Sequence, residues 1–244
     1  MIQIQHLSKT FTHPVLRNVT LRVPAGCLYG LIGPGASGKS VLLKMITALM
    51  RPDSGTLHVD GQDVLGLSDI ELAAFRLKFG MLFQNNALFD SMTVADNIAF
   101  PLRRLGQVSE AEISDRVRER LSAVSLAEFG DRNPSSLSGG QKKRVGVARA
   151  TITRAPIIFY DEPAAGLDPV TSQRIFDLLR KEQESAKTTV IMVSSDIDRL
   201  LTVTDRVGMM FRGSLVFDGS TAEAAKSEEP HVKQFIHGLA EGPL

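Results

Sequence analysis

The sequence predicts an α/β fold with a mostly parallel sheet, and three observations support this class. First, a glycine-rich loop at residues 33–40 stands between an apolar strand and a helix. Second, strand and helix patterns alternate from Ala155 onward, which favours parallel strands. Third, residues 85–136 carry apolar positions at helical spacing. The length of 244 residues and the 43% hydrophobic content suit one large domain with a substantial core.

The expected elements follow the chain in order. Short strands are expected over 15–23, 28–32, 56–59 and 81–83, with one helix after Gly38. A helix is then expected where four apolar residues recur at intervals of three or four: Ile113, Val117, Leu121 and Val124. Strands return at 157–160 and 189–193 on either side of a helix through Ile175, Leu178 and Leu179. A hairpin around Arg212-Gly213 and a short helix near 232–239 are expected to complete the fold.

Composition narrows the possible functions. Twenty-eight basic against 27 acidic residues give a formal charge of +1, so the overall charge balance does not point to nucleic acid or to an anionic membrane surface, and any function that depends on charge must be local. The single cysteine, Cys27, lies in an apolar run, so we expect it to be buried and the compartment to be the reducing cytoplasm. No signal peptide pattern and no bilayer-length apolar stretch is present, so any membrane must be spanned by another protein.

The phosphate loop is the strongest motif. It reads Gly33-Pro34-Gly35-Ala36-Ser37-Gly38-Lys39-Ser40 and fits G-x-x-x-x-G-K-[ST]. Glycines let the backbone approach a pyrophosphate, and the following helix directs its positive end at the anion. Lys39 is expected to reach the β- and γ-phosphates of ATP, and Ser40 to ligate Mg²⁺.

Two adjacent carboxylates, Asp161 and Glu162, follow the apolar run 157–160. On a continuing strand, neighbouring side chains point in opposite directions, so the two acids are expected to have different tasks. Asp161 is placed to hold Mg²⁺, and Glu162 to polarise the water that attacks the γ-phosphate. An acidic pair of this kind is elsewhere a helix cap or a solvated turn, but the phosphate loop favours the catalytic interpretation.

A third motif, Leu137-Ser138-Gly139-Gly140-Gln141, resembles the signature of ATP-binding-cassette (ABC) ATPases, and the resemblance extends over nearly the whole chain. Physically, Ser138 caps a helix whose free N–H groups form a second anion site. The resemblance implies that this tip, Ser138, Gly139, Gly140 and Gln141, closes over ATP held by a second copy of the chain. It also implies a P-loop NTPase core with an N-terminal antiparallel β-subdomain and an inserted helical subdomain.

The same resemblance gives approximate boundaries within this single ABC nucleotide-binding domain. The RecA-like core is expected at about 1–84 and 155–225, the helical subdomain at about 85–154, and a C-terminal helix at about 229–240. Further site residues are carried over by position: Phe11 to stack on adenine, Gln84 to sense the γ-phosphate and metal, and Asp168 in the loop that crosses the dimer interface.

One position departs from the family pattern. Where V-[ST]-H-D is expected, the chain reads Val193-Ser194-Ser195-Asp196, so Ser195 takes the place of a histidine that contacts the γ-phosphate. A serine hydroxyl is shorter and carries no positive charge. No histidine lies close to Ser195 in sequence. ATP binding is expected to survive, and hydrolysis by the isolated chain is expected to be slow.

Residues 83–94, 97–102 and 232–243 resemble the ATPases paired with MCE-domain lipid transporters, the Mla type. This resemblance implies phospholipid transport between inner and outer membranes, at the cytoplasmic face of a bacterial inner membrane. It implies a transmembrane permease partner, MlaE-like, with MCE-domain and STAS-domain accessory subunits. An apolar segment after Gln84 is suited to receive a permease helix, or else to fill the helical subdomain; its apolar residues are Ala87, Leu88, Phe89 and Met92.

Three alternatives stay open at this point. A transporter ATPase for another substrate has the same motifs. A regulatory subunit that binds nucleotide without productive turnover is consistent with Ser195, although Glu162 argues against it. A soluble ABC protein of DNA repair, chromosome organisation or translation is disfavoured, because the chain has one uninterrupted cassette and no basic stripe.

Overall fold

The computed structural model describes residues 1–244, which form two compact units. Unit 1 comprises Met1–Lys78 and Lys187–Leu244, and unit 2 comprises Phe79–Ala186. Each unit contains part of the predicted site. No helix in either unit is both long enough and apolar enough to cross a bilayer.

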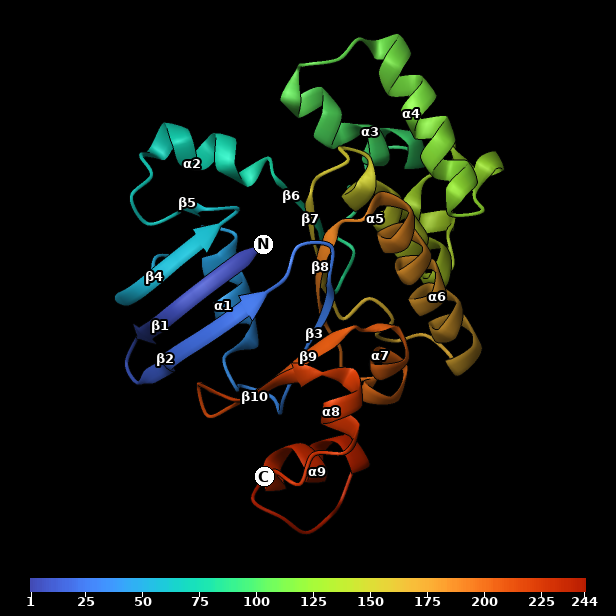
Figure 1. Cartoon of the computed structure of the whole chain (residues 1–244). Helices are drawn as coiled ribbons and strands as arrows, with labels where there is room; N and C mark the ends of the chain where they lie inside the picture. Colours follow the sequence, from blue (N-terminus) through green and yellow to red (C-terminus); the bar gives the residue numbers. More distant parts are fainter. The chain divides into compact units, whose positions relative to one another are not determined.

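Unit 1 contains an antiparallel sheet in the order β2-β1-β4-β5 (Figure 1). Its strands are β1 (Ile2–Thr10), β2 (Pro14–Val23), β4 (Ser54–Val59) and β5 (Gln62–Asp63). In β1, Ile2 pairs with Val23 on one side and with Val59 on the other, and all three side chains are fully buried. Burial of one face explains the alternating apolar pattern of these strands.

A second set of strands in unit 1 carries the phosphate loop. These are β3 (Leu28–Ile32), β8 (Thr189–Val193), β9 (Arg206–Phe211) and β10 (Ser214–Ser220). Strand β3 pairs in parallel with β8 and β9, and β10 returns antiparallel to β9 in the expected hairpin. Every residue of β3 and β8 is buried, as in strands covered on both faces. The helices of unit 1 are α1 (Lys39–Ile46), α2 (Asp69–Arg76), α7 (Ile197–Val203), α8 (Thr221–Ala225) and α9 (Pro230–His237).

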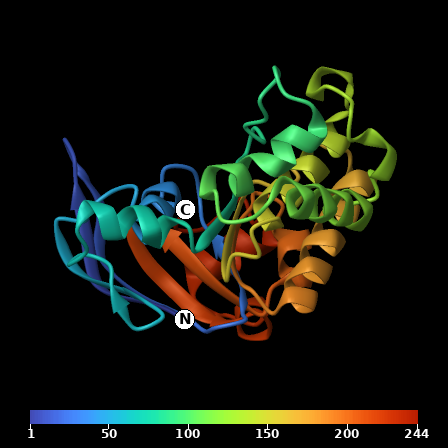
Figure 2. The same cartoon turned by 90° about the horizontal axis from the view of Figure 1, so that it is seen from above.

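Unit 2 combines two parallel strands, β6 (Phe79–Leu82) and β7 (Ile157–Asp161), with a group of helices. The helices are α3 (Val94–Leu105), α4 (Glu110–Ala123), α5 (Gly139–Thr151) and α6 (Pro169–Ala186), with short 3₁₀ turns at Ala127–Phe129 and Pro134–Ser136. Helix α5 packs against α3, α4, α6 and β6, so it forms the centre of the unit. Figure 2 shows α3, α4 and α5 gathered together, in green to olive.

Several elements match the sequence predictions and others differ. The strands at 28–32 and 189–193 have the predicted bounds, and Ile113, Val117, Leu121 and Val124 are buried along and just after α4. The strand expected at 81–83 instead spans Phe79–Leu82. It includes Gly80, where an added Cβ would lie 2.1 Å from the carbonyl oxygen of Ala150, so only glycine lets α5 approach this strand. Cys27 is buried, as predicted.

Candidate nucleotide-binding site

The phosphate loop joins β3 to α1 in unit 1, and two of its glycines have conformations that other residues rarely adopt. Gly33 has a φ of 137° and Gly38, the N-cap of α1, has a φ of 104°. A Cβ on Gly33 would lie 2.0 Å from the carbonyl oxygen of Met210 in β9. The loop therefore needs glycine at Gly33 for its own fold as well as for access to an anion.

The Lys39 ammonium lies over the phosphate loop. Its Nζ donates to the carbonyl oxygens of Gly33 at 2.7 Å and Pro34 at 2.9 Å, and to Ser37 Oγ at 3.2 Å. Ser37 is only 3% exposed, whereas Ser40 is exposed on the first turn of α1. The cation is thus held at the mouth of the loop, next to the first turn of α1, whose backbone N–H groups have no carbonyl partner within the helix.

Phe11 lies in the turn between β1 and β2 and is 52% exposed, so it is not a core residue. The nearby Lys9 ammonium is 5.7 Å from the centre of its ring. Lys9 also pairs with Asp53 at 2.6 Å, and Asp53 accepts from the backbone N–H of Thr10 at 2.7 Å. These contacts hold an exposed aromatic face that a planar base can stack on.

Ser195 is exposed just beyond β8, and Asp196 caps the following helix α7. The Asp196 carboxylate accepts from the backbone N–H of Arg199 at 3.3 Å and pairs with its guanidinium at 2.6 Å. A cavity of about 320 Å³ is lined by residues 195–198 and, from the end of α9, by residues 235–238. One of them is His237, which lies far from Ser195 in the sequence but lines the same cavity in the fold.

In unit 2, Asp161 is the last residue of β7, but Glu162 does not continue the strand. Glu162 has a φ of 48°, in the left-handed region that is uncommon for residues other than glycine. The expectation that strand alternation separates the two side chains is therefore wrong for Glu162. The backbone turns after Asp161 instead, and strain of this kind is concentrated at functional sites.

Ser138 caps α5, as expected from the sequence. Its Oγ accepts from the backbone N–H of Gln141 at 3.3 Å, and the Gln141 side chain accepts from the Ser138 N–H at 2.8 Å. This reciprocal capping box fixes the entry of the helix and leaves its other early N–H groups available. A Cβ on Gly140 would lie 2.7 Å from Thr171 Cγ2, so Gly140 also lets α6 approach.

Asp168 lies just before α6 and is exposed. Its carboxylate accepts from the backbone N–H groups of Val170 and Thr171, each at 3.0 Å. Hydrogen bonds from the Thr171 hydroxyl and from these N–H groups lower the pKa of Asp168. Within its own chain Asp168 is thus a charged helix cap, held in an exposed position.

A functional candidate that sequence reasoning missed is Lys143 in α5, which is 3% exposed. Its ammonium donates to the backbone carbonyl oxygen of Gln84 and, at 3.1 Å, to that of Glu162. Lys142, its neighbour in sequence, is partly exposed. Two adjacent lysines on a helix give no sequence signal to show which one is buried.

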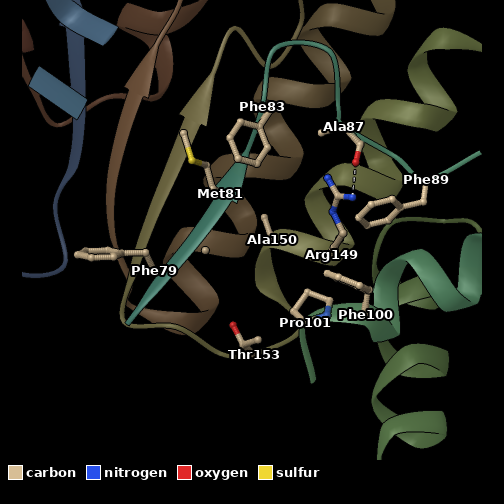
Figure 3. A pocket seen from close by; sticks show the side chains of 11 residues that line it. Phe79, Met81, Phe83, Ala87, Phe89, Phe100, Pro101, Arg149, Ala150 and Thr153 are labelled. Carbon is tan, nitrogen blue, oxygen red and sulfur yellow. Dashed lines mark hydrogen bonds between the residues drawn. The ribbon is translucent and has the colours of Figure 1, made fainter. Parts of the chain in front are cut away.

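An apolar groove of about 270 Å³ follows Gln84 in unit 2 (Figure 3). It is lined by Phe79, Gly80, Met81, Phe83, Ala87, Phe89, Phe100, Pro101, Arg149, Ala150 and Thr153. The rings of Phe89 and Phe100 have centres 4.8 Å apart, and Figure 3 shows Pro101 and the Arg149 guanidinium beside them. Ala87 and Phe89 were expected in such a surface; Leu88 and Met92, also expected there, do not line the groove.

The residues predicted to hold Mg²⁺ are a hydroxyl, an amide and a carboxylate: Ser40, Gln84 and Asp161. All three offer oxygen atoms, which Mg²⁺ prefers, and the ion commonly completes its shell with substrate phosphates and water. No group of three or more His, Cys, Asp or Glu side chains is arranged to hold a metal. Each of the three residues therefore offers an oxygen ligand of the kind that Mg²⁺ prefers.

Comparison with known proteins decides the family. The profile described as ABC transporter matches residues 16–165, which include the phosphate loop, the Ser138 tip and the Asp161-Glu162 pair. The chain belongs to the ABC transporter family. It is an ATP-binding subunit whose ATPase activity is coupled to transport, and the predicted P-loop fold with its antiparallel β-subdomain is confirmed.

Two relatives show how this ABC subunit aligns over its length. It is 41% identical to the probable ribonucleotide transport ATP-binding protein mkl of Mycobacterium bovis, over 100% of this chain and 68% of the relative. It is 39% identical to methionine import ATP-binding protein MetN 1 of Pseudomonas putida, over 97% of this chain and 72% of the relative.

Solved ABC structures give the same fold. The dimeric cassette MJ0796 bound to ADP and Pi matches with a TM-score of 0.82 and 32% identity, over 91% of this chain and 99% of that one. CbiO1 from Clostridium perfringens, part of the cbiONQ transporter complex, matches with a TM-score of 0.86 and 26% identity, over 93% and 91% of the two chains.

Proposed function

We propose that this subunit binds Mg-ATP between two copies of itself and uses closure and hydrolysis to drive a membrane permease. The observation that carries the proposal is the presence of two helix tips built for anions, at α1 and at α5. One phosphate loop suffices for one triphosphate, so the Ser138 tip serves the ATP of a partner. The dimeric state of MJ0796 with ADP and Pi supports this arrangement.

The roles of the residues follow from their chemistry. Lys39 binds the β- and γ-phosphates, Phe11 stacks on adenine, and Ser40, Gln84 and Asp161 supply oxygen ligands to the Mg²⁺ that accompanies ATP. When bound, Mg²⁺ would neutralise charge on the phosphates. Glu162 accepts a proton from the attacking water while the bond between the β-phosphate oxygen and the γ-phosphorus breaks. Ser138, Gly139, Gly140 and Gln141 of the partner copy complete the site, with Asp168 at the interface between copies.

The apolar groove is the proposed contact for the permease. Phe83 and Phe89 are 42% and 40% exposed, and such exposed aromatic side chains gathered in a hollow suit a short amphipathic helix. The segment that follows Gln84 lines this groove with Ala87 and Phe89. A permease helix bound in the groove would therefore contact the residues next to Gln84, the predicted sensor of the γ-phosphate. We propose that this contact holds the subunit at the cytoplasmic face of a bacterial inner membrane.

For the substrate we propose phospholipid, carried by an MlaE-like permease with MCE-domain and STAS-domain partners. Support comes from segments 83–94, 97–102 and 232–243, which resemble ATPases of MCE-domain lipid transporters. Ribonucleotide and methionine are the competing substrates, since relatives bear those names. Reconstituting the copurified complex in liposomes tests the three: fluorescent phospholipid should stimulate ATP hydrolysis, and stimulation by methionine or ribonucleotide alone would exclude lipid.

The ATP-dependent dimer is tested with Glu162→Gln, which retains the shape of Glu162 and removes its basicity. With Mg-ATP this variant should form a stable dimer in mass photometry, because bound ATP is not turned over. The matched control is Glu162→Gln combined with Lys39→Ala, which should stay monomeric. A Glu162→Gln protein that is monomeric at saturating Mg-ATP, with its permease supplied, would refute the proposal.

A further inference from the structure

Helix α5 buries two cationic side chains, Lys143 and Arg149, which are 3% and 8% exposed. Lys and Arg are rarely buried to this extent unless partners compensate their charge. Neither residue belongs to the Ser138 tip, and neither is predicted to contact ATP. Their burial therefore requires another explanation.

Both side chains bind backbone carbonyls of one segment, residues 84–89, here named the Gln84 loop. Lys143 Nζ donates to the carbonyl of Gln84, and Arg149 donates to those of Asn86 and Ala87, the latter at 2.7 Å. Asn86 and Ala87 have φ values of 60° and 49°, so the loop has an uncommon left-handed backbone at two successive residues. The two cations of α5 hold the loop in that shape.

Lys143, unlike Arg149, also forms a hydrogen bond to Glu162, the predicted catalytic base. The same ammonium donates to the carbonyl of Glu162 at 3.1 Å, where the backbone has left-handed φ. Burial lowers the pKa of Lys143, while the Glu162 and Asp161 carboxylates act in the opposite direction and favour the charged form. A charged donor shared by two carbonyls ties them more strongly than a neutral one.

We propose that Lys143 is the positioning residue that couples the Gln84 loop, and hence the apolar groove, to the backbone of Glu162. This inference rests on the proposed function, because it assigns permease docking to the groove and proton acceptance to Glu162. Moving the Gln84 carbonyl displaces the shared ammonium, and the Glu162 carbonyl follows. Because the peptide unit is planar and the turn at Glu162 is tight, this rotation re-aims the Glu162 side chain.

The test compares Lys143→Met with wild type in the full chain, alone and copurified with its permease. Methionine retains an unbranched apolar stem and loses both charge-assisted hydrogen bonds. We expect permease stimulation of kcat to fall about tenfold or more, as for loss of one or two such bonds, with ATP affinity within about twofold. Lys142→Met is the matched control, since it removes the adjacent, partly exposed lysine of the same helix; its stimulation should equal wild type.

A second variant and a second readout keep the test decisive if Lys143→Met does not fold. Lys143→Gln keeps one N–H donor group without charge, so its stimulation should lie between those of wild type and Lys143→Met. Hydrogen–deuterium exchange of residues 84–89 should also increase in either variant, while exchange in β3 stays unchanged. Wild-type stimulation in Lys143→Gln or Lys143→Met would overturn the coupling role.

Failure of this inference is distinguishable from failure of the proposed function. If Glu162→Gln dimerises with ATP while the Lys143 variants keep full stimulation, only the coupling role of Lys143 is wrong. If Glu162→Gln does not dimerise, the shared ATP site is wrong whatever the Lys143 variants do.

Discussion

Gly33→Ala is expected to damage the fold of the phosphate loop before any nucleotide is added. An alanine Cβ at this residue would lie 2.0 Å from the carbonyl oxygen of Met210, and the φ of 137° is strained for any residue with a side chain. The unfavourable φ costs about 1–3 kcal/mol. Relief of the overlap by shifting β9 costs a further 1–3 kcal/mol or so. The free energy of unfolding should therefore fall by about 2–6 kcal/mol, against a typical total of about 5–15 kcal/mol.

The same loop offers a matched control in Gly35. A Cβ on Gly35 meets nothing within 4 Å, and its φ is not in the left-handed region. Gly35→Ala should change the free energy of unfolding by less than about 0.5 kcal/mol. Urea unfolding of both variants without ATP, followed by titration with a fluorescent ATP analogue, measures stability and binding separately. A Gly33→Ala protein as stable as Gly35→Ala would refute the steric reasoning.

Three further outcomes are expected. Ser138→Ala should lower the free energy of unfolding by about 1 kcal/mol through loss of the α5 cap, and should weaken ATP-driven dimerisation of the Glu162→Gln protein. Unchanged dimerisation would show that Ser138 caps the helix without contributing to ATP binding. Ser195→His should raise kcat of the isolated chain about tenfold, because an imidazole is longer than a serine hydroxyl and can donate a hydrogen bond to the γ-phosphate; an unchanged rate would show that Ser195 does not limit turnover. Phe89→Asp should abolish copurification with the permease and leave isolated ATPase unchanged, whereas retained copurification would place the permease elsewhere.

The sequence predicts best those features that depend on local pattern. The fully buried strands 28–32 and 189–193 are continuous apolar runs, so their bounds are predicted correctly. The phosphate loop and the Ser138 cap are fixed by short motifs, and the structure forms both. Helix α2 was missed, although Ser68 and Glu71 form the capping box that signals its start. Its eight residues are too few to show a clear apolar period.

Features that depend on tertiary contacts were not predictable in the same way. The end of the apolar run 157–160 indicates where the strand stops, but it does not indicate the left-handed backbone that follows at Glu162. Burial of Lys143 depends on carbonyls from Gln84 and Glu162, both distant in the chain. His237 reaches the Ser195 cavity only because α9 folds back onto the start of α7. Such contacts leave no periodic or motif signal in one sequence.

The central claim is that each ATP is held by the phosphate loop of one copy and the Ser138 tip of the other. Mixing two inactive proteins tests it most directly: Lys39→Ala and Ser138→Arg, each in the Glu162→Gln background. Neither forms a complete site by itself, but a mixed pair contains one intact phosphate loop facing one intact tip. Mass photometry with Mg-ATP should therefore show dimers in the equimolar mixture and monomers in each protein alone. A mixture that stays as monomeric as its components would contradict the shared site.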